Sequence, residues 1–271
     1  MGAPRLATKG PGGTRLYPWP PNDPDYYAPS VTTVLGKLAK PALVPWAAKV
    51  TAEQAVRMTA SGALAGLVAM GEAAAVAALK DAPRNQRDSA GNFGTLVHEA
   101  LEAWATGREL PPLSGPAAEA WAHLVVLLDR LDLEPLHAEC TVFGDVTDEA
   151  TAYAGTADLV AEVTIPGRGR VRVVADLKTN RGGAYPEAAF QLAAYRAASH
   201  LVTDTGDVRA MPETSGALVL AVRPDGASAV PVDAGPDALQ VFRALRVVHG
   251  LTTNGTRFVR APLNLGGLTN D

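Results

Sequence analysis

The hydrophobic positions change their period near the middle of the chain. Between about residues 30 and 131, apolar side chains recur at helical spacing in alanine-rich stretches. We predict helices over 45–80, 94–106 and 116–131, with a polar break at 81–92 and a short helix that Ser30 caps. Residues 1–29 are rich in Gly and Pro, so we expect an irregular arm there.

After residue 135 the pattern is typical of strands. The stretches "LHAECTVF", "AGTADLVAEVTI" and "RVRVVADL" are rich in Val and Thr with a short apolar period, and the turn "PGRGR" joins the last two into a hairpin. A helix from Pro186 to about His200, strands at 216–222 and 227–233, and a helix over 236–250 follow. We therefore expect an α/β fold with a mixed central sheet flanked by helices. The predicted organisation is an arm (1–29), a helical annex (30–90), a core (91–250) and an extended or loose tail (251–271).

Composition excludes some function classes and leaves nucleic acid open. The chain has 271 residues, 47% hydrophobic residues and a net charge of −4, so a DNA partner requires a local basic surface. One cysteine, Cys140, excludes an intrachain disulfide framework and an iron–sulfur cluster held by several thiolates, and we expect it to be buried. We expect a soluble cytoplasmic protein, because the start of the chain has no apolar leader and the 60–79 stretch is interrupted by Glu72.

Two carboxylates mark one end of the predicted hairpin. Asp158 lies early on one strand and Asp176 late on the next, so antiparallel pairing brings them to the same end. A divalent cation removes their repulsion, and carboxylate oxygens suit Mg²⁺ or Mn²⁺. The alternative is a pair of solvated aspartates at strand ends.

Lys178 lies two residues after Asp176, so both side chains project from the same face of the strand. Arginine outnumbers lysine eighteen to six in this chain, and no other lysine follows Lys80. A compact ammonium can orient or deprotonate a water, which guanidinium cannot do. Lysine at this position therefore indicates chemistry, although a salt-bridged strand lysine gives the same short pattern.

Four sequence pieces in this order resemble the PD-(D/E)XK nuclease superfamily, in particular the RecB-type nuclease domains and their phage and prophage members. The pieces are "GTLVHEALE" (94–102), "AGTAD" (154–158), "VVADLKTN" (173–180) and "QLAAY" (191–195). The resemblance covers about residues 94–200. It implies a restriction-endonuclease-like core.

The resemblance also implies roles for individual residues. His98, Asp158 and Asp176 would bind one or two Mg²⁺ or Mn²⁺ ions together with the main-chain carbonyl of Leu177, and Lys178 would activate the attacking water. Gln191 and Tyr195, four apart on one helical face, would contact DNA and steady the region around the lysine. From the residues alone, Glu102 is placed to accept the second N–H of His98, and Glu139 is a further ligand or supporting group unless it is a surface strand residue.

The implied function is metal-dependent hydrolysis of DNA phosphodiester bonds, most readily by an exonuclease of recombination, repair or phage DNA processing. Such an enzyme works beside a single-strand annealing or recombinase protein. The expected phosphate contacts are Ser30, Thr32, Thr179, Arg181 and the hairpin arginines 168, 170 and 172, which also fit a solvated face. A structure-specific endonuclease, an enzyme acting on RNA and a non-catalytic nucleic-acid-binding module remain alternatives. The sequence does not determine polarity, strand preference or oligomeric state.

Overall fold

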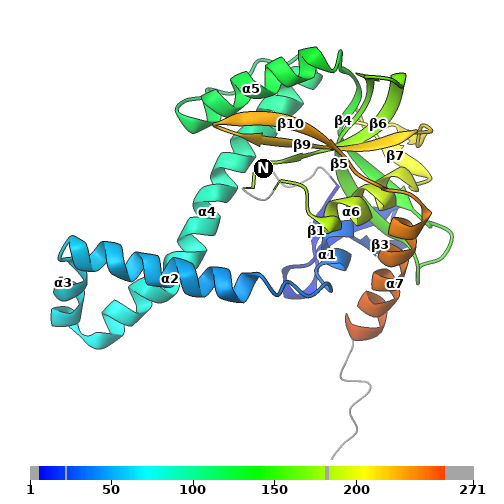
Figure 1. Ribbon diagram of the computed structural model, residues 1–271. Helices are drawn as coiled ribbons and strands as arrows, with labels where there is room; N and C mark the ends of the chain where they lie inside the picture. Colours follow the sequence, from blue (N-terminus) through cyan, green and yellow to red (C-terminus); the bar gives the residue numbers. More distant parts are fainter. Residues whose placement is uncertain (1–5, 22, 181–182, 254–271) are drawn as a thin grey trace, which may run out of the picture.

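A seven-stranded mixed sheet with helices on both faces forms the centre of the molecule (Figure 1), in a computed structural model that describes residues 6–21, 23–180 and 183–253. The strand order is β10-β9-β6-β5-β4-β7-β8, and β6 and β9 are parallel whereas the other neighbours are antiparallel. The strands are β4 (Glu134–Gly144), β5 (Tyr153–Ile165), β6 (Gly169–Lys178), β7 (His200–Val202), β8 (Val208–Ala210), β9 (Gly216–Arg223) and β10 (Gly226–Pro231). The expected mixed α/β class is confirmed.

The predicted hairpin is the middle of this sheet. β5 and β6 pair antiparallel from Leu159 opposite Ala175 to Ile165 opposite Gly169, and the turn between them is where "PGRGR" predicts it. The short strands β7 and β8, at one side of the sheet, were not predicted. Three-residue strands carry too little periodic signal to be seen in a sequence.

Side chains on β6 alternate between the two faces of the sheet. Val173, Ala175 and Leu177 pack in the cluster formed with α4 (Glu72–Ala105) and α5 (Pro116–Arg130). Val174 packs in the opposite cluster with α1 (Val31–Leu35), α6 (Pro186–Arg196) and α7 (Pro236–Thr253). Because successive strand side chains point to opposite faces, Asp176 and Lys178 share the α6 face.

A helical arm projects from the sheet (Figure 1), built from α2 (Leu43–Ala60), α3 (Ala63–Met70) and the first half of α4. The predicted polar break at 81–92 is wrong. α4 is 34 residues long, contains Pro83 and runs through this stretch without interruption. Ala75 and Ala82 are buried, and α4 packs against both α2 and α3 along this stretch. The polar side chains that suggested a break are exposed, which a helix tolerates.

The annex and the core therefore share one helix, and their boundary at residue 90 falls inside α4. α1 also lies within the expected annex but belongs to the core, since Val31 and Val34 are fully buried with α6 and α7. The projecting part of the annex accordingly begins at α2.

Residues at the N-terminus form strands where an irregular arm was expected. β1 (Thr8–Lys9), β2 (Arg15–Trp19) and β3 (Tyr26–Pro29) make a separate three-stranded sheet. Tyr17 is fully buried with Phe143 and Ala154, so aromatic packing against the main sheet overrides the Gly- and Pro-rich composition. Of the expected tail, residues 251–253 end α7 and the remainder lies outside the described residues.

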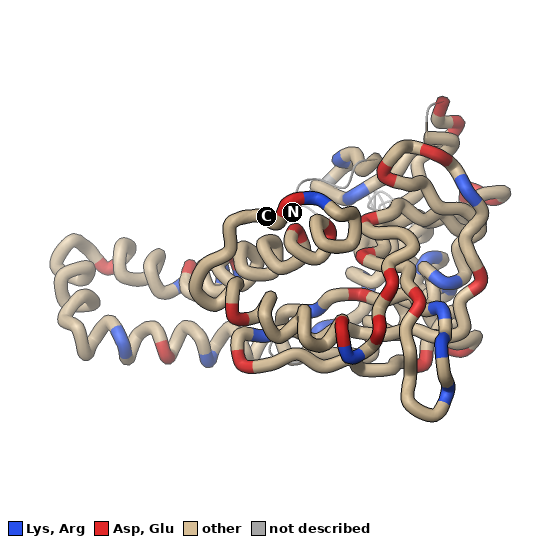
Figure 2. Tube along the Cα trace, turned by 90° about the horizontal axis from the view of Figure 1, so that it is seen from above, with Lys and Arg blue, Asp and Glu red and all other residues tan. Residues whose placement is uncertain are grey.

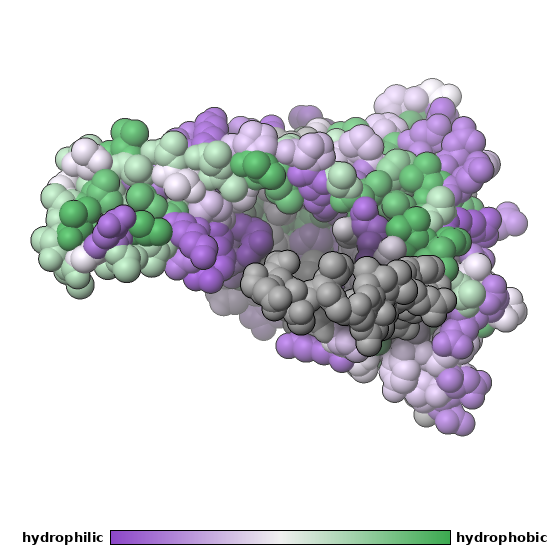
Figure 3. Space-filling model, turned by 90° about the horizontal axis from the view of Figure 1, so that it is seen from below, coloured by the Kyte–Doolittle hydropathy of each residue, from purple (hydrophilic) through white to green (hydrophobic). Residues whose placement is uncertain are grey.

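The molecular surface is mixed, with apolar side chains exposed on the arm (Figure 3). Val44, Val56 and Met70 are more than two-thirds exposed, and α3 has no buried residue. No helix in the described ranges combines the length and the apolar character needed to cross a membrane. Cys140 is buried as expected, and burial raises the pKa of its thiol to about 12.

Candidate metal centre

Asp158 and Asp176 face one another where the pairing of β5 and β6 ends. Each lies one residue beyond the last pair, Leu159 opposite Ala175, so continuing the register sets the two aspartates opposite each other. In place of a further ladder bond, the main-chain N–H of Leu177 donates to Oδ2 of Asp158 at 2.6 Å. The hairpin therefore delivers two almost fully buried carboxylates to one point at the edge of the core.

His98, Glu139 and Asp158 come together in what we call the metal-ligand group. One side-chain ligand atom from each of these three residues lies within 4.8 Å of the other two. His98 comes from α4, and its Nδ1 is 3.6 Å from Oδ2 of Asp158, too long for a hydrogen bond. That nitrogen is buried and has no hydrogen-bond partner. An unpartnered imidazole nitrogen beside two carboxylates is a donor set that can hold a metal ion.

Glu139 reaches this group from a distorted position in β4. Its neighbours Ala138 and Cys140 pair with Leu159 and Ala157, so Glu139 lies opposite Asp158 across the strands. Its φ of 46° is in the left-handed region, which costs a glutamate about 1–3 kcal/mol. Strain of this size within a paired strand is typical of a site under a functional constraint.

Burial shifts the pKa values of Glu139, Asp158 and Asp176 upward, and the charge of Asp158 adds to the shift of the other two. Burial, followed by the charge of Asp158, raises the pKa of Glu139 to about 8. Burial raises the pKa of Asp158 to about 6, and burial together with Asp158 does the same for Asp176. Burial also lowers the pKa of His98 to about 4, so its ring is neutral at pH 7. A bound cation would reverse the penalty on all three carboxylates.

Lys178 lies next to Asp176. Its Nζ is 2.6 Å from Oδ2 of Asp176, and it donates to Oε1 of Gln191 at 3.3 Å. Burial lowers the pKa of Lys178, but Asp176 and Asp158 outweigh it and the net shift is upward. The ammonium is therefore protonated at neutral pH while the carboxylates carry no other cation.

Gln191 connects the lysine to the aspartate through both ends of its amide. Its Nε2 donates to Oδ1 of Asp176 at 2.9 Å and to the hydroxyl of Tyr195 at 3.2 Å. Tyr195 is only 2% exposed, so it supports Gln191 from within the core and does not reach the surface. The direct DNA contact expected of Tyr195 is absent from this arrangement.

Two glycines in the quoted sequence pieces allow close packing behind the centre. A Cβ on Gly94 would lie 2.8 Å from Oγ1 of Thr179, where α4 crosses the end of β6. A Cβ on Gly155 would lie 2.6 Å from the ring of Tyr195. Glycine at these positions therefore lets α4 and α6 approach the strands that carry the aspartates.

Other expected site residues have different partners. Glu102 forms a 2.6 Å ion pair with Arg108, and its contribution to the centre is a weak repulsion that raises the pKa of Glu139. Ser30 is buried and caps α1 by accepting from the N–H of Thr33, so it is a structural residue. Thr32 is exposed on α1, and Thr179 lies against Gly94. Arg181 lies outside the described residues.

The hairpin arginines lie at the far end of β5 and β6 from the metal-ligand group. Arg170 pairs with Asp132, Glu134 and Glu162, and Arg172 also pairs with Glu162. Arg168 is exposed in the turn. The charges of Arg170 and Arg172 are balanced by carboxylates, which fits the solvated face that was the alternative to a DNA contact.

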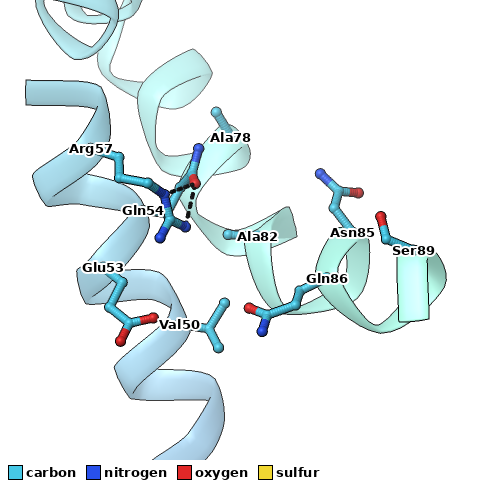
Figure 4. A pocket seen from close by; sticks show the side chains of 9 residues that line it. All are labelled: Val50, Glu53, Gln54, Arg57, Ala78, Ala82, Asn85, Gln86 and Ser89. Carbon is cyan, nitrogen blue, oxygen red and sulfur yellow. Dashed lines mark hydrogen bonds between the residues drawn. The ribbon is translucent and has the colours of Figure 1, made fainter. Parts of the chain in front are cut away.

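A groove in the arm is separate from this centre. It has a volume of about 460 Å³ and lies between α2 and α4 in the arm (Figure 4). Its floor is Val50 and Ala82, and its rim is mostly amide and hydroxyl side chains together with Arg57, which is hydrogen bonded to Gln54. None of the residues of the metal-ligand group lines it.

No family model matches this chain, and a search of curated proteins finds no match to it.

Proposed function

We propose that this protein is a metal-dependent nuclease of the PD-(D/E)XK type that hydrolyses phosphodiester bonds in DNA. One observation carries the proposal: Nζ of Lys178 lies 2.6 Å from Asp176 at the point where Asp158, His98 and Glu139 also meet. A salt-bridged surface lysine would not need three further ionisable side chains gathered around its partner. Nuclease chemistry uses such a set, with carboxylates for the metal and an amine for the water.

The donor set fits Mg²⁺ or Mn²⁺ better than a softer ion. His98, Glu139 and Asp158 would hold the ion, and the family resemblance adds Asp176 and the main-chain carbonyl of Leu177 as further ligands. Three features fit a cation: the orphaned Nδ1 of His98, the three raised carboxyl pKa values and the strained backbone of Glu139. When bound, the ion supplies Lewis-acid stabilisation of the phosphate and a lowered pKa for a coordinated water.

The chain itself supplies positioning and proton transfer. Gln191 fixes the separation between Asp176 and Lys178, since one amide bonds to both. The pKa of Lys178 is raised by two carboxylates, so neutralising those carboxylates lowers it toward the range of a general base. Lys178 is then placed to accept a proton from a water beside Asp176 and to orient that water for in-line attack.

The order of the strands and helices that carry the site also supports the proposed nuclease function. An antiparallel hairpin carries the two aspartates, and the helix that follows it carries Gln191 and Tyr195. The arm projects from the sheet (Figure 1). If it forms one wall of a substrate path, it favours action at strand ends over internal cutting. We therefore propose an exonuclease of DNA recombination, repair or phage DNA processing that works beside a strand-annealing or recombinase protein.

Digestion of end-labelled linear duplex, single-stranded and closed circular DNA tests this function. Wild type and Lys178→Ala are compared with Mg²⁺, Mn²⁺ or EDTA, and Lys178→Arg serves as the charge-preserving control. We expect metal-dependent loss of linear DNA, with a fall of at least ~100-fold in both variants because neither can replace the amine as proton acceptor. Cutting of circles would instead assign an endonuclease, and DNA binding without cleavage by wild type would refute the proposal in favour of a binding module.

A further inference from the structure

The helix that supplies His98 also carries a row of cations along the arm. Lys80, Arg84 and Arg87 are followed by Gly91, Gly94 and His98, at intervals of four, three, four, three and four residues. Side chains three, four and seven residues apart lie on one face of an α-helix. The three cations and the metal-ligand histidine therefore share one face of α4.

This face changes its environment where the helix leaves the core. In the second half of α4, Gly94 packs against Thr179 at the end of β6 and Leu101 is buried in the core. In the first half, the same face has no sheet beneath it and carries the three exposed cations. Ala75 and Ala82, which are buried in the arm, lie on the other side of the helix. Neither is three, four or seven residues from any of the three cations, so neither shares their face.

The row is therefore not used to hold the arm together. Arg84 approaches Asp81 at 3.2 Å and Arg87 approaches Asp88 at 3.7 Å, but all four side chains are at least 44% exposed. Such exposed pairs contribute little to stability and are readily exchanged for another anion. No ion pair is shown for Lys80 within the described ranges.

The segment that contains these three cations is also more basic than the rest of the chain. Residues 30–90 contain seven Lys and Arg against four Asp and Glu, a net charge of +3, whereas the whole chain has −4. The remaining residues therefore carry a net charge of −7. Figure 2 shows basic positions along both long helices of the arm. A basic projection on an acidic protein attracts a polyanion to that projection alone.

We infer that the cationic row, Lys80, Arg84 and Arg87, binds the phosphate backbone of a nucleic-acid strand and guides it along α4 toward the metal centre. This inference rests on the proposed nuclease function and specifies how its substrate is held. At 1.5 Å per helical residue, Arg87 is about 16 Å and Lys80 about 27 Å from His98 along the axis. With about 3.4 Å per nucleotide, the row contacts phosphates about five to eight nucleotides from the scissile bond.

The span makes the effect of the row dependent on substrate length. We expect Lys80→Ala, Arg84→Ala and Arg87→Ala combined to lower kcat/KM for a 20-nucleotide substrate at least tenfold, chiefly through KM. Hydrolysis of a four-nucleotide substrate and of bis-p-nitrophenyl phosphate should be unchanged, because neither reaches the row. Binding of the 20-mer can be followed by fluorescence anisotropy at several salt concentrations. The slope of the logarithm of the binding constant against the logarithm of the salt concentration should become less steep by about two to three.

The matched control removes three exposed arginines of the core, Arg130, Arg209 and Arg243, and so changes the net charge equally. Equal behaviour of the two triple variants on the 20-mer would overturn the inference while leaving the nuclease proposal intact. If wild type hydrolyses no phosphodiester, the proposed function fails. The anisotropy titration alone then tests whether the cationic row binds nucleic acid. No binding by wild type, or a salt slope that the substitutions leave unchanged, would refute the inference.

Discussion

Nε2 of Gln191 donates a hydrogen bond of 2.9 Å to Oδ1 of Asp176, while the other end of the same amide accepts from Lys178. One neutral side chain thus sets the spacing between a carboxylate proposed as a metal ligand and the amine proposed to activate water. The site depends on this amide for orientation, although the amide itself has no acid–base chemistry.

Replacing Gln191 should therefore reduce turnover without removing any ionisable group. We expect Gln191→Ala to lower kcat about 10–100-fold, the usual range when a group that orients metal ligands is lost. Tyr195→Phe is the matched control, because it removes only the 3.2 Å contact to Gln191 and keeps the buried ring. Its effect should be several-fold at most. An equal loss in both variants would place the critical function in the tyrosine hydroxyl.

The metal-free protein should lose stability as pH rises from about 4 to 8. Asp158, Asp176 and Glu139 have pKa values raised above their ordinary values, so the folded state binds more protons than the unfolded state in this range. For one isolated carboxyl, a rise of about two units corresponds to about 3 kcal/mol once the group is ionised. The penalty is small near pH 4, grows as the two aspartates ionise around pH 6, and continues to grow through pH 8 as Glu139 ionises.

Thermal melts with and without Mn²⁺ measure this linkage. The stabilisation by Mn²⁺ should be several degrees at pH 8 and should vanish near pH 4, where the carboxyls are protonated. Asp158→Asn with Asp176→Asn should melt higher than wild type at pH 8 without metal, and should not respond to Mn²⁺. A metal-free wild type whose melting temperature rises between pH 5 and 8 would contradict the raised pKa values.

Gly94 should be intolerant of even the smallest side chain. Its Cβ would meet Oγ1 of Thr179 at 2.8 Å, so Gly94→Ala requires Thr179 to change its rotamer or α4 and the end of β6 to separate, and we expect the separation to displace His98 from the aspartates. We expect weaker Mn²⁺ binding by calorimetry and lower activity. Gly91→Ala, one turn earlier, is the control, since a Cβ there meets nothing within 4 Å and alanine stabilises an exposed helix by up to about 1 kcal/mol. Similar metal affinities in both variants would refute the close-packing argument.

Sequence patterns predicted the parts of the fold that have strong local periodicity. The hairpin of β5 and β6 was predictable because its two strands alternate clearly and Gly and Pro mark the turn between them. The continuity of α4 was not, because its exposed polar stretch and Pro83 look like a loop until α2 and α3 are known to pack beside it. The strands at the N-terminus depend likewise on a distant partner, Phe143.

The candidate centre shows the same division. The opposition of Asp158 and Asp176 follows from strand register, and the position of Lys178 follows from strand periodicity. The pairing of Glu102 with Arg108 does not, because it depends on how the chain turns after α4. Glu139 was expected as a further ligand or supporting group, and it does lie with His98 and Asp158. The left-handed backbone that places it there, within a strand, has no local signal in the sequence.

Arg170 provides a final prediction, on a basic residue that should not affect catalysis. It bonds to Asp132, Glu134 and Glu162 at the end of the hairpin away from the metal-ligand group. Arg170→Ala leaves three neighbouring carboxylates without this cation, so the melting temperature should fall, and should fall less in high salt because the repulsion is screened. Cleavage of long DNA at a temperature well below the melt should match wild type. A raised KM for DNA with an unchanged melting temperature would instead place Arg170 on the substrate path.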